Sequence, residues 1–237
     1  LLLGAPLLAF LIDRYGWRAA YIALALLNGL AAIAIFRLMP APQAAGAATK
    51  TSLFGGLPRS AWPPLIASAA VAGAGMSIFV VMGAWLSDDY GLSVAGLGAI
   101  ATGIGAAELA SSSAVAVVAD RIGIRRSVGI GGLLLGLGLV IIAISNYSVI
   151  IALIGLIVLV IGFEYGFVSS LSLMSEAAPQ ARGTAIAVGN AIATITRASL
   201  IVISGQCYER FGILGSATVS AAALCAAAAA LISDRRR

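Results

Sequence analysis

Three charged residues lie inside long apolar stretches of this sequence: Glu108, Glu164 and Arg197. Glu164 falls within residues 149–172, a stretch long enough to cross the roughly 30 Å apolar core of a bilayer. A charge at that depth costs about 2.5–3.5 kcal/mol, so it usually faces a cavity or a partner. Residues of these types can carry a proton, bind a charged ligand group or pair with each other.

The composition excludes a soluble globular domain. The 237 residues are 61% hydrophobic and 10% charged, with a mean hydropathy of +1.08, whereas soluble domains contain about 25% charged residues. Because lipid cannot satisfy unpaired backbone groups, we expect an all-α polytopic membrane protein. The net charge of +5 does not indicate a nucleic-acid partner, because the basic residues lie in short loops.

The apolar stretches predict one truncated and seven complete transmembrane helices. Residues 1–12 form the truncated one, and the opening at Leu1 inside an apolar run favours a fragment. Residues 40–60, rich in Pro, Ala, Gly and Thr, are interpreted as a cytoplasmic linker. We therefore expect the end of an N-terminal half at 1–39 and a six-helix C-terminal half at 61–237. The complete spans are expected at 19–39, 62–86, 94–118, 128–144, 149–172, 183–206 and 213–232.

Lysine and arginine predict the orientation of these spans. One set of alternate loops holds ten basic residues, and the other holds only Arg14, Arg18 and Arg210. This bias places the linker, the loop at 120–126 and the C-terminus in the cytoplasm. The chain is thus expected to be a multi-pass protein of the cell (inner) membrane.

Two short turns, far apart in the chain, have similar sequences. Residues 13–17 read Asp-Arg-Tyr-Gly-Trp, and residues 209–213 read Glu-Arg-Phe-Gly-Ile. Each lies between two expected spans, and six spans separate them, so both copies have the same orientation. Parallel repeats of six spans are typical of the two halves of one transporter fold.

The loop at 120–126 carries a resemblance to a known family. It reads Asp-Arg-Ile-Gly-Ile-Arg-Arg, with Ala116 and Ile124 in place of a glycine and a basic residue of the family's pattern. Residues 176–183, with Glu176, Pro179 and Arg182, form a second loop that is similar to one in the same family. In order, sidedness and spacing, the chain resembles the major facilitator superfamily from the end of helix five to helix twelve. The resemblance implies a gating motif made of Asp120, Arg121, Gly123, Arg125 and Arg126.

The resemblance also implies a role for each span. Two would line a central cavity (62–86 and 149–172), two would contact the other half (94–118 and 183–206), and two would face lipid (128–144 and 213–232). The polarity of the spans agrees with this division, because Glu108, Glu164 and Arg197 all lie on cavity or interface spans.

A polar stripe predicts one wall of the cavity. Asn190, Thr194, Arg197, Ile201 and Ser204 fall on one helical face, and we take Asn190, Thr194 and Ser204 as cavity-lining. Arg197 either forms a static pair with Glu164 or takes part in function. Glu108, which shares a face with Ser112, is either a hydrogen-bonded neutral acid or a proton carrier. If Glu164 pairs with Arg197, Glu108 is the better carrier.

We expect a secondary active transporter that moves a small organic molecule by alternating access, with proton-coupled efflux first and uptake symport second. Its partners would be the substrate, protons, the lipid bilayer and a missing N-terminal half. An enzyme is not expected, because the sequence lacks histidine and nucleophile motifs. A retinal receptor needs a lysine within a span, and Lys50 is in the linker. No metal or cofactor is expected, and Cys207 and Cys225 are interpreted as small buried hydrophobes.

Overall fold

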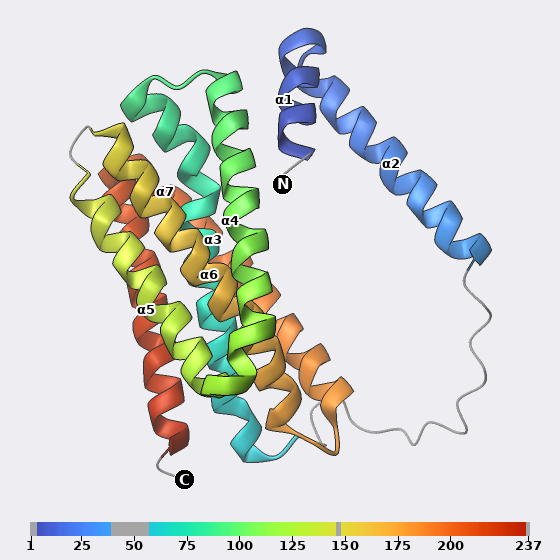
Figure 1. The fold of residues 1–237 in the computed structure, drawn as a ribbon, viewed down its shortest axis with the longest axis vertical. Coiled ribbons are helices and arrows are strands. Elements are labelled where there is room, and N and C mark those ends of the chain that lie inside the picture. Colours follow the sequence, from blue (N-terminus) through green and yellow to red (C-terminus); the bar gives the residue numbers. More distant parts are fainter. Residues whose placement is uncertain (1–3, 39–56, 146–147, 236–237) are drawn as a thin grey trace.

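The computed structural model describes residues 4–38, 57–145 and 148–235, and all regular structure in these ranges is helical (Figure 1). Within these ranges, six helices are long and apolar enough to cross a membrane, which confirms an all-α membrane protein with several spans. Most of the expected linker at 40–60 lies outside the described residues. The elements are α1 (Gly4–Tyr15), α2 (Trp17–Leu38), the short 3-10 helix η1 (Arg59–Ala61), α3 (Trp62–Tyr90), α4 (Val94–Ile122), α5 (Ile124–Ala143), α6 (Val149–Ala177) and α7 (Arg182–Arg235).

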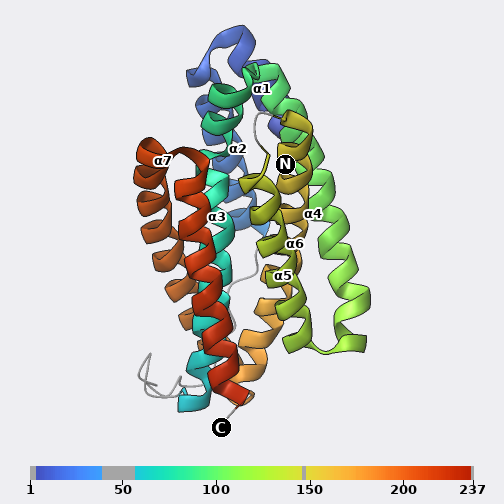
Figure 2. The same ribbon diagram turned by 90° about the vertical axis from the view of Figure 1, so that its left-hand side faces the viewer.

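The expected count of eight helices is wrong for the described chain, which has seven α-helices. The two last expected spans form one element, α7, because residues 208–211 are helical rather than a loop. Only Gly212 leaves the helical conformation, with φ 62° and ψ −155°. The chain reverses there, so α7 consists of a first leg (182–211) and a second leg (213–235), which lie side by side in Figure 2.

The reversal at Gly212 has a counterpart at Gly16. Gly16 separates α1 from α2 and has a φ of 80°, a left-handed conformation that glycine adopts without steric cost. These are the two glycines of the repeated turns at 13–17 and 209–213. The repeated sequence therefore forms the same kind of sharp helix-to-helix turn twice.

The helices continue beyond the apolar stretches that predicted them. α3 runs through Asp88 and Asp89 to Tyr90, and α4 runs through Arg121 to Ile122. Their ends are fixed by glycines with positive φ, Gly91 and Gly123, whose N–H groups bond to the preceding helical turn. Apolar length reports membrane thickness, whereas capping residues set the helix ends.

The core lies where α3, α5, α6 and both legs of α7 meet. Ile78 and Trp85 of α3, Leu135 of α5 and Leu159 of α6 are fully buried in one cluster. Ser220 in the second leg donates to the Ala74 carbonyl of α3 at 2.7 Å. These contacts place α3 at the centre of the bundle.

The N-terminal hairpin has little contact with this bundle. α1 packs against α4, where a side chain on Gly98 would meet the Ala9 methyl group at 2.9 Å. α2 extends away from the bundle in Figure 1, and Ala20 is its buried residue. The large apolar side chains of α2 are thus left exposed.

The bundle exposes two different surfaces. On one side, α5 and the second leg of α7 present apolar side chains such as Leu133 and Leu214. On the other, α4 and the first leg of α7 expose Leu109 and Ile195 together with polar groups. The charged residues inside the spans belong to α4, α6 and the first leg of α7, and none belongs to the first surface.

Candidate functional site

The contact between α4 and α6 includes a hydrogen bond to a charged side chain inside a span. Ser112 of α4 donates to the Glu164 Oε1 of α6 at 2.6 Å. One residue earlier, Ser111 donates to the Ile161 carbonyl of α6 at 2.8 Å. Adjacent serines therefore fix the rotation of α4 relative to α6 and aim the Glu164 carboxylate at α4.

Glu108 lies one helical turn before Ser112, on the side of α4 that faces Glu164. Both glutamates are half-buried, and their negative charges are close enough to interact. Neither forms an ion pair with a residue that the structure describes. The site thus holds two acids from adjacent helices and a hydroxyl donor bound to one of them.

Arg197 does not complete this site. Its guanidinium donates to the Thr194 hydroxyl of its own helix at 3.3 Å, and no ion pair joins it to Glu164. The ion pair between Glu164 and Arg197, one of the two alternatives that the sequence left open for Arg197, is therefore absent from this structure. The physical reason is the rotation of α6, because the bond with Ser112 directs Glu164 toward α4 instead of α7.

The polar stripe on the first leg of α7 is exposed in one part and buried in another. Asn190 and Thr194 are exposed, next to half-buried Arg197. Ser204 is fully buried instead and donates to the Ser77 carbonyl of α3 at 2.5 Å. Ser204 therefore holds two helices together in this structure, and the exposed polar surface ends before it.

The junction between α4 and α5 carries the sequence motif at 120–126. Gly123, with a φ of 89°, is the single residue between the two helices. Arg121, Arg125 and Arg126 are exposed around it, while the Asp120 side chain lies outside the described part. The motif thus occupies one tight corner of the bundle, at the opposite end of α4 from Ser93.

Sequence reasoning missed two groups of hydrogen bonds. One is the bond from Ser111 to the Ile161 carbonyl, although Ser111 adjoins Ser112 on the face that includes Glu108. At the other end of the bundle, the Tyr208 hydroxyl donates to Asp88 Oδ2 at 3.2 Å, and the Tyr90 and Ser145 hydroxyls are 3.1 Å apart. These bonds join the ends of α3, α5 and the first leg of α7. The only sequence signal for them is the presence of polar residues near the expected helix ends.

Comparison with models of protein families identifies one family. The Major Facilitator Superfamily profile matches residues 1–198 and, in a second match, residues 64–237, so the two matches together cover the whole chain. No curated protein matches the chain. The matched family consists of membrane transporters rather than enzymes, and the multi-span helical architecture agrees with it. This chain therefore belongs to the Major Facilitator Superfamily.

Proposed function

We propose that this chain is part of a secondary active transporter that exports a small organic molecule in exchange for protons, by alternating access. The observation that supports proton coupling is the arrangement of Glu108, Glu164 and Ser112 at the contact of α4 and α6. Polar acids inside spans usually mark ion or proton pathways. In this proposal the chain is a multi-pass protein of the inner membrane with a cytoplasmic C-terminus.

The two glutamates have different roles in this proposal. The Ser112 hydroxyl stabilises a charged Glu164, because hydrogen bonds to ionised acceptors are short and strong. A second negative charge on Glu108 would repel the first in a medium of low dielectric. A proton on Glu108 removes that repulsion, so Glu108 is the group that we expect to load and release protons during transport.

Arg197 and its neighbours are proposed as substrate-facing groups. Arg197, Asn190 and Thr194 lie together on the first leg of α7 and are at least partly exposed. Arg197 is free of any ion pair with Glu164, so its guanidinium can bind an acceptor group of a substrate. The exposed surface of α4 and the first leg is then the wall of the transport pathway.

A second half is proposed to complete that pathway. The exposed surface of α4 and the first leg of α7 combines apolar side chains with Glu108, Asn190 and Arg197, which suits a water-filled interface better than lipid. α1, which we assign to the end of the other half, already packs on α4. Residues 1–39 would belong to the N-terminal half and residues 61–237 to the C-terminal half.

The 237-residue chain reconstituted alone in vesicles should show no saturable transport. The reason is that a site between two halves needs groups from both of them. The measurement is proton movement, followed with a pH-sensitive dye inside the vesicles, while candidate substrates are added. Saturable, protein-dependent flux from the chain alone would overturn the two-half proposal.

The direction of transport is tested in the complete transporter with an imposed pH gradient. An exporter that exchanges substrate for protons drives substrate toward the acidic side, whereas an uptake symporter drives it toward the alkaline side. Substrate accumulating on the alkaline side would replace efflux by symport. A substrate flux that does not change with the pH gradient would contradict proton coupling.

Replacing Asp120 by Asn should lower the transport rate several-fold without lowering stability. Asp120 lies in the last turn of α4, where an acid opposes the helix dipole by about 0.3–1 kcal/mol. Its position therefore favours a role in gating over a role in capping. Initial flux and the melting temperature are measured on the same preparation. An unchanged flux, or a fall in melting temperature that accounts for the lost flux, would contradict gating.

A further inference from the structure

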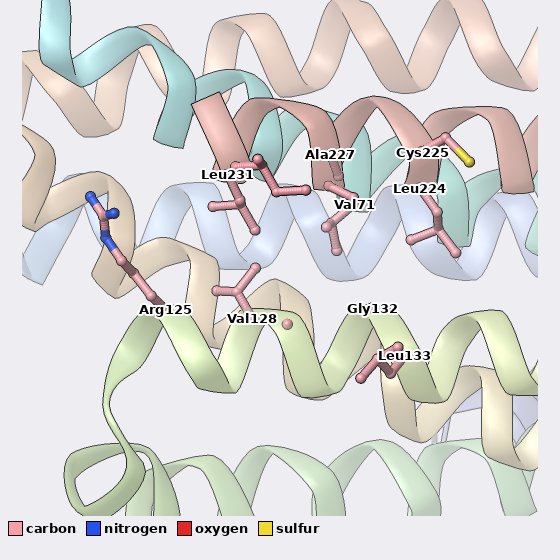
Figure 3. Close-up of a pocket in the computed structure, with 12 residues that line it drawn as sticks. Val71, Arg125, Val128, Gly132, Leu133, Leu224, Cys225, Ala227 and Leu231 are labelled. Carbon is pink, nitrogen blue, oxygen red and sulfur yellow. The ribbon is translucent and has the colours of Figure 1, made fainter. Parts of the chain in front are cut away.

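A groove of about 430 Å³ runs between α5 and the second leg of α7 (Figure 3). Val71 of α3, almost fully buried, forms its floor. Val128 and Leu133 line it from α5, and Leu224 and Leu231 line it from α7. The groove therefore opens on the apolar surface of the bundle, away from Glu108 and Glu164.

Glycines keep this groove open. Those of α5 fall on two faces, and Gly131 and Gly138 press against the α6 backbone. Gly129 and Gly132 line the groove instead. A side-chain carbon on Gly129 would meet nothing within 4 Å, and one on Gly132 would meet only Leu224, at 4.0 Å. Packing does not require glycine at these two positions, so the space is available to a molecule that is not part of the chain.

One end of the groove carries positive charge. Arg125, at the start of α5, lines it there and lies near Leu231 in Figure 3. A guanidinium has five N–H donors, so it can contact a phosphate alongside another partner. An anionic group is therefore favoured at this end.

The groove matches one leaflet of a bilayer in length. From Arg125 to Leu133 the helix rises by about 12 Å, eight steps of about 1.5 Å. Half of an apolar bilayer core measures about 15 Å. An acyl chain that starts from a headgroup at Arg125 would thus follow the groove toward the middle of the membrane.

We propose that this groove binds an anionic phospholipid, with one acyl chain between α5 and the second leg of α7 and its phosphate at Arg125. The apolar part alone does not select a lipid, because all acyl chains are as apolar as the groove. Selection comes from Arg125, and one such cation near the surface should give an anionic lipid an advantage of about five-fold. The loop at 120–126 is on the side assigned to the cytoplasm, whose leaflet carries anionic lipids.

The test uses the 237-residue chain in nanodiscs of phosphatidylcholine with phosphatidylglycerol. The chain is released, and native mass spectrometry counts the phosphatidylglycerol molecules that remain bound. We expect one to be retained in preference to phosphatidylcholine. Arg125→Gln should lower its retention about five-fold, and Gly132→Leu should lose it by filling the groove with protein atoms.

Two control variants match these changes. Arg126→Gln removes the same charge from an exposed neighbour that does not line the groove. Gly103→Leu adds the same side chain to α4, where a side-chain carbon meets nothing within 4 Å. Both controls should retain the lipid. A second readout is the rise in melting temperature when phosphatidylglycerol is added in detergent. It should be smaller in Arg125→Gln, vanish in Gly132→Leu and persist in the controls.

Each other outcome overturns the proposal. Equal retention of phosphatidylcholine and phosphatidylglycerol would show that Arg125 selects nothing. Equal losses in Arg125→Gln and Arg126→Gln would show general attraction to a basic loop. Full retention in Gly132→Leu would place the bound lipid elsewhere, and a protein dimer that forms through this surface would assign the groove to a second copy of the chain.

Discussion

Glu108→Gln in the complete transporter should abolish accumulation driven by a pH gradient, with a fall of at least about ten-fold, a difference of about 1.4 kcal/mol. Substrate exchange at equal pH on both sides should continue. Glutamine keeps the shape of the side chain but cannot release a proton, and exchange requires no net proton movement. Vesicles assayed with and without the gradient measure both quantities on one preparation.

Glu164→Gln should damage both activities. The amide oxygen can still accept from Ser112, but the charge that favours a proton on Glu108 is gone. Arg197→Gln should likewise damage both, because the proposal places Arg197 at the substrate. The contrast between Glu108→Gln and Arg197→Gln separates proton carrying from substrate binding.

Two adjacent serines supply a matched control. Ser112→Ala removes the hydroxyl that Glu164 accepts from, so the pH dependence of transport should shift. Ser113 bonds only to the Leu109 carbonyl of its own helix and is exposed, so Ser113→Ala should leave the pH dependence unchanged. If Glu108→Gln retains full pH-driven accumulation, the proton carrier lies outside this pair, and the second half is the next place to search.

The sequence was sufficient to find the charges but not the partner of each one. Depth within a span follows from counting apolar residues, which located Glu108, Glu164 and Arg197. The rotation of a helix about its axis depends on packing against its neighbours, and α6 is almost uniformly apolar. Periodicity therefore could not tell whether Glu164 faces α4 or α7. The Ser112 bond decides this in the structure.

Burial on a helical stripe was equally hard to predict. Asn190, Thr194 and Ser204 share a face by spacing, yet only Ser204 reaches α3. Cys225, expected to be buried, is exposed. Both cases depend on where a neighbouring helix crosses, and crossing points between helices distant in the sequence leave no trace in local spacing.

The glycines of α5 give the sharpest example of this limit. Five of them lie between residues 129 and 138, and all were compatible with close helix contact. The structure places the Gly131 backbone against Gly166 and the Gly138 backbone against Leu159, both of α6. Gly129 and Gly132 line the groove, and Gly136 lies opposite Leu224 of the second leg of α7. Close approach is therefore a property of two of the five positions.

Gly131→Ala should destabilise the bundle by about 1–3 kcal/mol. Its methyl group would overlap backbone atoms of Gly166, and backbone cannot move aside as a flexible side chain can. α5 and α6 would have to separate, which would loosen the core around Leu135 and Leu159. The measurement is thermal unfolding in detergent. It is monitored by the loss of the monodisperse peak in size-exclusion chromatography.

Gly132→Ala is the matched control for this change, one residue along the same helix. Its methyl group would lie 4.0 Å from Leu224, an ordinary contact. Alanine also favours a helix over glycine by about 0.5–1 kcal/mol, so this variant should melt at or above the temperature of the unmodified chain. Equal melting temperatures for the two variants would mean that α5 and α6 do not approach through Gly131 and Gly166. A low melting temperature for Gly131→Ala alone would establish that contact as the one that fixes α5 against the core.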